Sequence, residues 1–278
     1  MKILNGKELS QKVRINIQEY TNLLVKKPEL AVVLVGDDEA SKVYVRNKKI
    51  ACEQCGIINH EYVMSGDTTQ EQLLEKVKEL NENSNINGIL IQFPLPKHIN
   101  EQEIIENIDP NKDVDAFHSA NVHKIVKGNF DFLPCTPSGI IALLEENNVE
   151  IEGKKAVIIG RSDIVGKPMA MLLMHKNATV TICHSKTKNI EEHTKNADII
   201  VVAIGKPNFL TQEMVADNAV VIDVGINRVD GKLCGDADFK NIAEKCSFIT
   251  PVPGGVGPMT VTTLMQNTIK AYKIQNNL

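Results

Sequence analysis

A tyrosine and a lysine four residues apart are the first side chains in this sequence whose types and spacing suit catalysis. Tyr44 and Lys48 belong to the segment SKVYVRNKK, in a pattern that predicts a helix from about Ser41 to Cys55, closed by Gly56. Residues four apart project from the same face of a helix, so a phenol ring and a proton-carrying amine would lie together. The same pair also occurs on ordinary protein surfaces. It therefore points to catalysis only in company with other polar groups.

Further polar groups follow an apolar strand in the same half of the chain. Gln92 in GILIQFPLP stands near the end of a buried apolar strand, at the carboxyl edge where α/β sheets bind ligands. The segment KDVDAFH then supplies Asp113 and Asp115, and either carboxylate could bind a planar, nitrogen-rich ligand through paired hydrogen bonds. Two rigid segments rich in proline and glycine, PCTPSG and TPVPGGVGPMT, complete a set of candidate substrate-binding loops.

A glycine turn in the second half indicates a dinucleotide site. The apolar strand KKAVIIG leads directly into Gly160, Arg161 and Ser162, and a helix is expected to open near Gly166. A turn between a strand and a helix N-terminus presents free backbone N–H groups and a favourable dipole to a pyrophosphate. Ser162 replaces the middle glycine of the commonest fingerprint, so the alternative is a plain turn without a ligand.

The end of the next strand bears on the choice between NAD and NADP. NAD sites usually place a carboxylate there to bind the ribose 2′-hydroxyl, but ATVTICHSKT offers none. Arg161 and Ser185 are available to hold a 2′-phosphate, and Lys186 is either a third contact or a solvated cation. The sequence therefore favours NADP.

The elements that must position these groups alternate between apolar strands and helical patterns, which is typical of parallel sheets. The expected fold class is α/β with two domains: an N-terminal α/β substrate and catalytic domain, and a Rossmann-like NADP-binding domain, with the C-terminal helix packing back on the first. The predicted boundaries are 1–120 plus 260–278 for the substrate and catalytic domain, and 121–259 for the NADP-binding domain. In the first, we expect strands at 30–35, 57–64 and 86–93 and helices at 41–55 and 69–83, the latter opened by a capping box from Thr68 to Glu71. In the second, we expect strands at 156–160, 179–184, 199–204, 220–224 and 248–250, before a last helix at 260–274.

Composition excludes several classes of function. The 278 residues carry a formal net charge of -4, which gives no basic field for nucleic acid or anionic lipid. No apolar run reaches the roughly 18 to 20 residues of a membrane span, and MKILNGKELS lacks the apolar core of a signal peptide, so a cytoplasmic protein is expected. Cys52 and Cys55 form a CxxC without a second pair nearby. We interpret them as ordinary thiols and expect no metal.

Nine motifs, in order along nearly the whole chain, resemble the bifunctional methylenetetrahydrofolate dehydrogenase/cyclohydrolase family: SKVYVRNKK, GILIQFPLP, KDVDAFH, PCTPSG, GRSDIVGKP, ATVTICHSKT, DVGIN, GDADF and TPVPGGVGPMT. The resemblance implies oxidation of 5,10-methylenetetrahydrofolate with NADP, hydrolysis of the methenyl product to 10-formyltetrahydrofolate, and a homodimer. It implies that Lys48 is the catalytic lysine, acting as base or as electrostatic stabiliser, that Gln92 supports it, that Tyr44 packs on the folate and that Asp115 anchors the pterin. It also implies further substrate contacts at Pro253 and Gly254, and NADP contacts at Gly160, Arg161, Ser162, Ser185 and Ile226.

Three positions depart from the family pattern. Ala116 and His123 stand where glycine is common, and Ala237 stands where valine is common. None removes a proposed catalytic group, although Ala116 could tighten the backbone beside Asp115. Two rival hypotheses stay open at this point: a shikimate-type dehydrogenase, which would have no hydrolase step, and a regulatory NADP-binding module, which would have no use for the lysine, glutamine and aspartate together.

Overall fold

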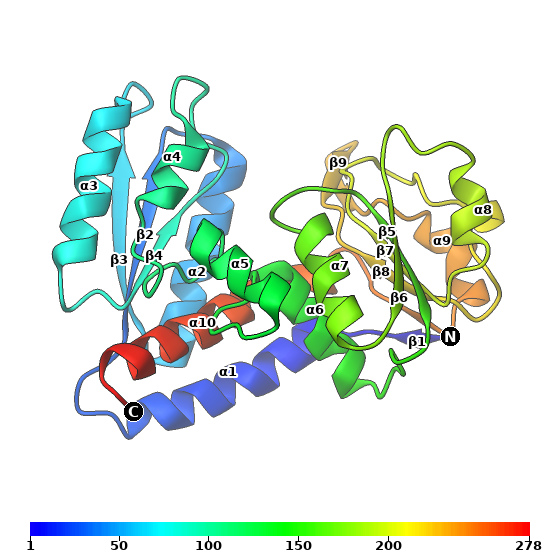
Figure 1. Ribbon diagram of the computed structural model, residues 1–278, viewed down its shortest axis with the longest axis horizontal. Helices are drawn as coiled ribbons and strands as arrows, with labels where there is room; N and C mark the ends of the chain where they lie inside the picture. Colours follow the sequence, from blue (N-terminus) through cyan, green and yellow to red (C-terminus); the bar gives the residue numbers. More distant parts are fainter. The chain divides into compact units, whose positions relative to one another are not determined.

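The computed structural model describes residues 1–278, which form two compact units (Figure 1). The three-stranded unit comprises Lys12–Leu133 and Val261–Leu278, and the six-stranded unit comprises Met1–Gln11 and Pro134–Thr260. This division differs from the predicted boundaries by more than one residue at two places. The first eleven residues belong with the six-stranded sheet, because β1 (Lys2–Ile3) pairs in parallel with β11 (Phe248–Ile249). Residues 121–133 stay in the three-stranded unit.

The three-stranded unit is a parallel sheet in the order β3-β2-β4, with the central strand buried on both faces. Apolar side chains of α3 and of alternate β2 residues share one core on one face, and α2 packs against β2 and β3 (Figure 1). The bounds of its elements are β2 Glu29–Val35, α2 Glu39–Cys55, β3 Ile58–Met64, α3 Gln70–Glu82, β4 Gly88–Ile91, α4 Glu101–Glu106 and α5 Ser119–Lys127. Helix α1 (Gly6–Asn22) leads into this unit and α10 (Val256–Gln275) ends it.

Local capping explains where two of these helices begin and end. Asp38 accepts a hydrogen bond from the Ser41 N–H at 2.8 Å at the start of α2, and Gly56 ends that helix in the left-handed conformation at φ 65°. In α3 the predicted capping box is wrong by one residue. The Thr69 hydroxyl accepts from the Gln72 N–H, and the Gln72 side chain accepts from the Thr69 N–H.

The C-terminal helix packs on the three-stranded unit, which confirms the prediction. The Asn267 amide on α10 donates to the Val114 and Leu133 carbonyls at 2.8 and 2.9 Å, and the Gln275 amide donates to the Asn87 carbonyl at 2.8 Å. The helix begins four residues before the predicted start, with a proline in its first turn, where the missing N–H costs no hydrogen bond.

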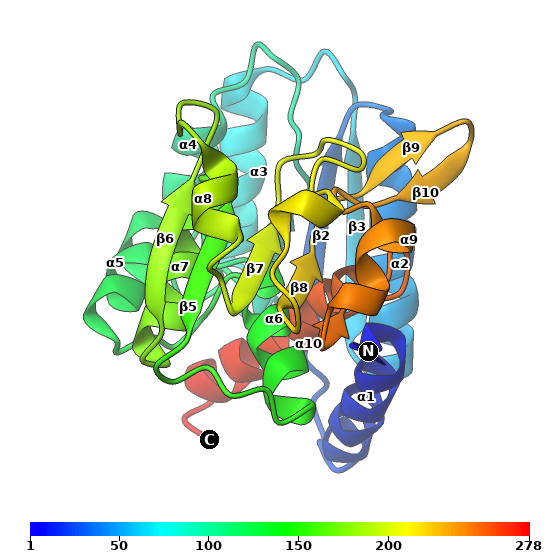
Figure 2. The same ribbon diagram turned by 90° about the vertical axis from the view of Figure 1, so that its right-hand side faces the viewer.

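The six-stranded unit is a parallel sheet in the order β1-β11-β8-β7-β5-β6, and Figure 2 shows its strands β6, β5, β7 and β8 side by side. The chain leaves β5 for β6 on one side and returns to β7 on the other, so the strand order reverses between β5 and β7. Such a topological switch point is where open α/β sheets bind ligands. The bounds are α6 Cys135–Glu146, β5 Lys155–Ile159, α7 Gly166–His175, β6 Thr179–Cys183, α8 Ile190–Thr194, β7 Ile199–Val202, β8 Val220–Asp223, β9 Asn227–Val229, β10 Lys232–Cys234 and α9 Phe239–Ile242.

No helix of the protein combines the length and the apolar character that crossing a bilayer demands.

Candidate functional site

The predicted catalytic lysine and glutamine are in direct contact. Lys48 Nζ on α2 donates to Gln92 Oε1, just after β4, at 2.9 Å. Gln92 is buried, and its Nε2 donates to the Phe93 carbonyl at 2.7 Å, so its amide oxygen is oriented toward the lysine. Tyr44 lies one turn before Lys48 and is 37% exposed, and partial burial raises the pKa of its hydroxyl. A half-exposed aromatic ring can pack on a ligand, and the oriented amine beside it can help to move a proton.

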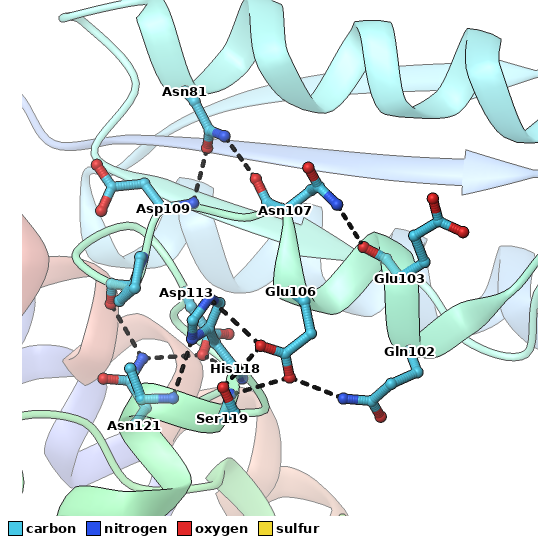
Figure 3. A network of polar contacts seen from close by, with 12 residues as sticks. Asn81, Gln102, Glu103, Glu106, Asn107, Asp109, Asp113, His118, Ser119 and Asn121 are labelled. Carbon is cyan, nitrogen blue, oxygen red and sulfur yellow. Dashed lines mark hydrogen bonds and ion pairs between the residues drawn. The ribbon is translucent and has the colours of Figure 1, made fainter.

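The two carboxylates of KDVDAFH are in different environments, which the sequence left open. Asp113 is buried, and its Oδ2 accepts from the His118 N–H and the Asn121 amide, both at 2.9 Å (Figure 3). Burial raises the pKa of Asp113, against the effect of these hydrogen bonds. Asp115 is only half-buried. Asp113 therefore serves the loop itself, whereas Asp115 is the less buried of the two carboxylates.

A network of polar contacts braces the same loop against α4 (Figure 3). Glu106 accepts from the Ser119 hydroxyl and from the Gln102 amide, both at 2.7 Å, and lies 3.7 Å from His118 Nε2. At the start of the loop, the Asn81 side chain accepts from the Asp109 N–H at 2.9 Å. The backbone on both sides of Asp113 is thus fixed from two helices.

Lys112 closes the end of α3 and is not part of the candidate site. Its buried ammonium donates to the carbonyls of Leu80, Asn81 and Asn83 at 3.0, 2.7 and 2.8 Å. These belong to the last carbonyls of the helix, which have no partner within it. Burial lowers the pKa of Lys112, and Asp109 partly offsets this.

The departure at Ala116 has a structural consequence. Ala116 is buried and adopts φ 60°, a left-handed conformation that costs roughly 1 to 2 kcal/mol for a residue with a Cβ. A glycine would adopt it without this cost. The backbone after Asp115 is therefore held in a strained turn.

The glycine turn after β5 has the close backbone approach expected at a dinucleotide site. Gly160 has φ 129°, and a Cβ there would lie 2.4 Å from the Ala203 carbonyl oxygen. A Cβ on Gly166 would lie 2.4 Å from the Gly160 oxygen, so α7 starts directly against the turn. Arg161 is exposed. Ser162 Oγ accepts from the Val165 and Gly166 N–H groups at 3.2 and 3.3 Å, so the serine side chain braces the turn that leads into α7.

The ends of β6 and β8 hold the other predicted cofactor residues. Ser185 and Lys186 are exposed in a turn after β6, and this turn is closed by a 2.8 Å bond from the Thr187 N–H to the His184 carbonyl. Ile226 follows β8 and is 49% exposed. Gly160, Ser185 and Ile226 thus follow strands that end at one edge of the sheet, and the residues present fit a dinucleotide that carries a 2′-phosphate.

Pro253 and Gly254 lie in the rigid segment before α10. Pro253 follows a cis peptide bond and is exposed, and Gly254 has φ 107°. The Gly254 carbonyl accepts from the Lys7 N–H at 2.9 Å, and a Cβ on Gly6 would lie 1.8 Å from the Gly255 oxygen. The N-terminal segment therefore packs directly on this loop. These two residues belong to the six-stranded unit, whereas Tyr44 and Lys48 belong to the three-stranded unit.

Sequence reasoning gave no role to the charged residues of DVGIN and GDADF. Asp223 and Asp236 are both buried and pack reciprocally. A Cβ on Gly235 would lie 1.8 Å from Asp223 Oδ2, and a Cβ on Gly225 would lie 2.2 Å from Asp236 Oδ1. An aspartate next to or near a glycine in each of two motifs is the signal that could have revealed the pair.

The CxxC pair was predicted to consist of ordinary thiols. Cys52 and Cys55 are fully buried in α2, and burial raises the pKa of their thiols to about 12 and about 11. Both are therefore protonated near neutral pH, and a buried thiol of this kind is unreactive.

Comparison with known proteins agrees with this arrangement. Residues 4–115 match the family model described as tetrahydrofolate dehydrogenase/cyclohydrolase, catalytic domain, and residues 134–276 match its NAD(P)-binding domain. The bifunctional protein FolD of Campylobacter hominis is 56% identical over 98% of both chains. A crystal structure of the Campylobacter jejuni FolD enzyme has a TM-score of 0.97 at 47% identity and covers both chains fully. The Trypanosoma brucei dehydrogenase-cyclohydrolase, solved in complex with NADP cofactor and inhibitor, has a TM-score of 0.95 at 35% identity over 99% of this chain and 98% of that one.

Likeness of this extent decides between the open hypotheses. The two family models together cover most of the chain, and the full-length identity exceeds half of the residues. The similarity extends over both units, so neither a shikimate-type dehydrogenase nor a regulatory module accounts for it. The chain belongs to the tetrahydrofolate dehydrogenase/cyclohydrolase family.

Proposed function

We propose that this protein oxidises 5,10-methylenetetrahydrofolate to the methenyl compound with NADP and hydrolyses that product to 10-formyltetrahydrofolate, within one-carbon metabolism. The observation that carries the proposal is the 2.9 Å contact between Lys48 Nζ and Gln92 Oε1 at the carboxyl edge of the three-stranded sheet, in a chain of this family. We assign catalysis and the folate contacts of Tyr44 and Asp115 to the three-stranded unit, and NADP binding to the six-stranded unit.

Hydride transfer mainly requires the alignment of two bound molecules. NADP, when bound, supplies the hydride acceptor. The Gly160 turn and the N-terminus of α7 would hold its pyrophosphate, and Arg161 with Ser185 would hold its 2′-phosphate. The NADP complex of the Trypanosoma brucei relative supports this choice of cofactor, as does the lack of a carboxylate among residues 183–188.

Folate binding is assigned to Tyr44, Asp115, Pro253 and Gly254. We assign the pterin to the half-buried carboxylate of Asp115, which can form paired hydrogen bonds with it. Asp113 is the weaker candidate, because it already accepts from the His118 N–H and the Asn121 amide. The partly exposed Tyr44 ring can pack against the ligand beside the lysine.

Hydrolysis requires proton transfers as water adds to the methenyl carbon and the ring opens. Lys48 is the group assigned to them, and the Gln92 amide oxygen holds its ammonium in one place. Because the Gln92 amide is itself oriented by the Phe93 carbonyl, the lysine cannot turn away without breaking a bond to a buried group. Acid–base help of this kind typically contributes about 10²- to 10⁴-fold in rate.

A homodimer is part of the proposal, and the surface of α2 and β3 is the one we assign to it. Strand β3 is an edge of its sheet, with unpaired backbone groups along one side. Val63 on this strand is 64% exposed, and Val43 and Ile50, two turns apart on α2, are 57% and 40% exposed. Sedimentation should give a dimer that Val63→Lys weakens, whereas a wild-type monomer would contradict this part.

Cytoplasmic location is also proposed, since all six cysteines are free thiols.

The experiment that tests the function is a spectrophotometric assay with methylenetetrahydrofolate and NADP. We expect methenyl absorbance that appears and then decays as the intermediate is hydrolysed. Activity with a hydroxy acid instead of the folate would indicate a shikimate-type enzyme, and NADP binding without turnover would indicate a binding module. Either result would contradict the proposal.

A further inference from the structure

The turn that follows β7 is held by a single buried carboxylate. Asp236 is 0% exposed, and its Oδ2 accepts from the N–H groups of Ile204 and Gly205 at 2.7 and 3.0 Å. Its Oδ1 accepts from the Lys206 N–H at 2.8 Å and from the Asn227 side-chain amide at 2.9 Å. Both carboxylate oxygens are thus fully used, by two chain segments that follow neighbouring strands.

Three successive backbone N–H groups that converge on one point form a nest that binds anions. At the ligand-binding edge of a sheet such a nest can receive a phosphate. Here Asp236 occupies the nest, so the three N–H groups of the turn at Ile204–Lys206 do not bind a ligand. A ligand would contact only the surface of this turn.

A second carboxylate fixes the first. Asp223 Oδ1 accepts from the N–H groups of Gly225 and Asp236 at 3.0 and 2.9 Å, and Oδ2 accepts from the Ala237 N–H at 2.9 Å. The backbone of Asp236 therefore cannot shift without breaking bonds to a buried group. Since the glycines at 225 and 235 leave no room for a Cβ, the two motifs can only pack in this register.

The turn lies at the topological switch point. Strands β5 and β7 are neighbours in the sheet, and a Cβ on Gly160 would lie 2.4 Å from the Ala203 oxygen. At this switch point, the glycine turn therefore lies on one side of the ligand-binding edge, and the segment that Asp236 holds lies on the other. Arg161 and Ser185 follow β5 and β6, so a dinucleotide with its 2′-phosphate there extends its other half over β7 and β8.

We infer that Asp236 is a positioning residue for the nicotinamide half of NADP, because it holds the turns after β7 and β8 in one arrangement. Asp223 acts through it by fixing its backbone. This inference rests on the cofactor orientation proposed above. It concerns hydride transfer alone, since the hydrolysis step involves no cofactor.

The test is Asp236→Asn, which keeps the size of the side chain. In either orientation the amide NH₂ replaces an oxygen that accepts two N–H groups, so donors face a donor and the turn must move. A displacement of about 1 Å can cost about 10²-fold in rate, so we expect kcat/KM of the dehydrogenase to fall by about 10- to 100-fold. Hydrolysis of added methenyltetrahydrofolate and the affinity for 2′,5′-ADP, which reports on the 2′-phosphate half, should stay at wild-type values.

Two further variants control this test. Asp217→Asn removes an 81% exposed carboxylate from the same unit and should change neither activity. Asn227→Ala removes one of the four donors to Asp236, and should produce a smaller loss of the same kind. If Asp236→Asn fails to fold, Asn227→Ala decides the question.

Several outcomes would overturn the inference. They are a dehydrogenase activity equal to that of the wild type, an equal loss of both activities, or a loss of affinity for 2′,5′-ADP as large as the loss of affinity for NADP. The cofactor orientation can fail separately. If Arg161→Ala leaves 2′,5′-ADP affinity unchanged, that orientation is wrong, while the ratio of the two activities in Asp236→Asn still decides whether the residue acts in hydride transfer.

Discussion

The pH dependence of stability in the six-stranded unit should depend on Asp223. Burial raises the pKa of this carboxyl to about 6, against three hydrogen bonds from backbone N–H groups and with a further contribution from the charge of Asp236. In the unfolded chain the same group is solvated and titrates near its ordinary value of 3.8.

The sign follows from the proton affinities of the two states. Because the folded pKa is the higher one, the folded state binds the proton more tightly, and the contribution of this group to stability is complete below pH 3.8 and is lost as the pH rises through 6. The gap between 3.8 and about 6 corresponds to about 3 kcal/mol in the free energy of unfolding. Of this, about 1 kcal/mol is lost between about pH 5 and pH 7.

Other titratable groups also contribute to the pH dependence of stability, so the measurement is a difference between proteins. Asp223→Asn removes the titration but places an amide donor against N–H groups, and we expect it to be less stable than wild type. Urea unfolding at about pH 5 to 7 should show the advantage of the wild type shrinking by about 1 kcal/mol as the pH rises. For the exposed control Asp217→Asn the curves should stay parallel. Parallel curves for Asp223→Asn, or an advantage that grows with pH, would refute the reasoning.

Three further variants test individual assignments. Arg161→Ala should weaken NADP binding by about 10- to 100-fold and barely change NAD binding, because charge-assisted hydrogen bonds to a 2′-phosphate are worth roughly 1.5 to 3 kcal/mol; equal losses in titrations with both would place the 2′-phosphate elsewhere. Asp115→Ala should raise the KM for folate in both activities and leave NADP affinity intact, whereas a normal KM would exclude Asp115 as the pterin anchor. Lys112→Met should lower the free energy of unfolding by about 1.5 to 3 kcal/mol, because three carbonyls at the end of α3 lose a charged donor; unchanged urea unfolding would show that this contact does not stabilise the helix.

The sequence predicted strands β2 to β8 and β11 and helices α2, α3, α7 and α10 because their apolar periods are local and strong, whereas it gave no prediction for the long helices α1 and α6. β2, β5 and β7 are fully or largely buried runs, and such runs are hard to mistake when turn residues flank them. The start of α3 shows the limit of such patterns. Thr68 with Glu71 and Thr69 with Gln72 both fit a capping box, and only the backbone geometry selects the second.

Features that depend on distant partners could not be predicted. The pairing of β1 with β11 joins two segments that are far apart in the chain through only two residue pairs, which is too short for a pattern. The choice between Asp113 and Asp115 depends on a turn in which Ala116 adopts a left-handed conformation that its residue type disfavours. The role of Asp236 depends on backbone N–H groups about thirty residues earlier, which no spacing reveals.

The most direct test of the central claim is the fate of the methenyl intermediate in Lys48→Gln. This change keeps length and polarity but removes the amine that contacts Gln92, while Lys49→Gln removes an exposed amine from the same helix as a matched control. Hydride transfer moves no proton to a side chain, so we expect Lys48→Gln to retain measurable dehydrogenase and to lose about 10²- to 10⁴-fold in hydrolysis. Methenyl absorbance should then accumulate during turnover with NADP, as it should not in the control. If Lys48→Gln hydrolyses added methenyltetrahydrofolate at the wild-type rate, Lys48 is a structural residue of α2 and the proposed mechanism is wrong.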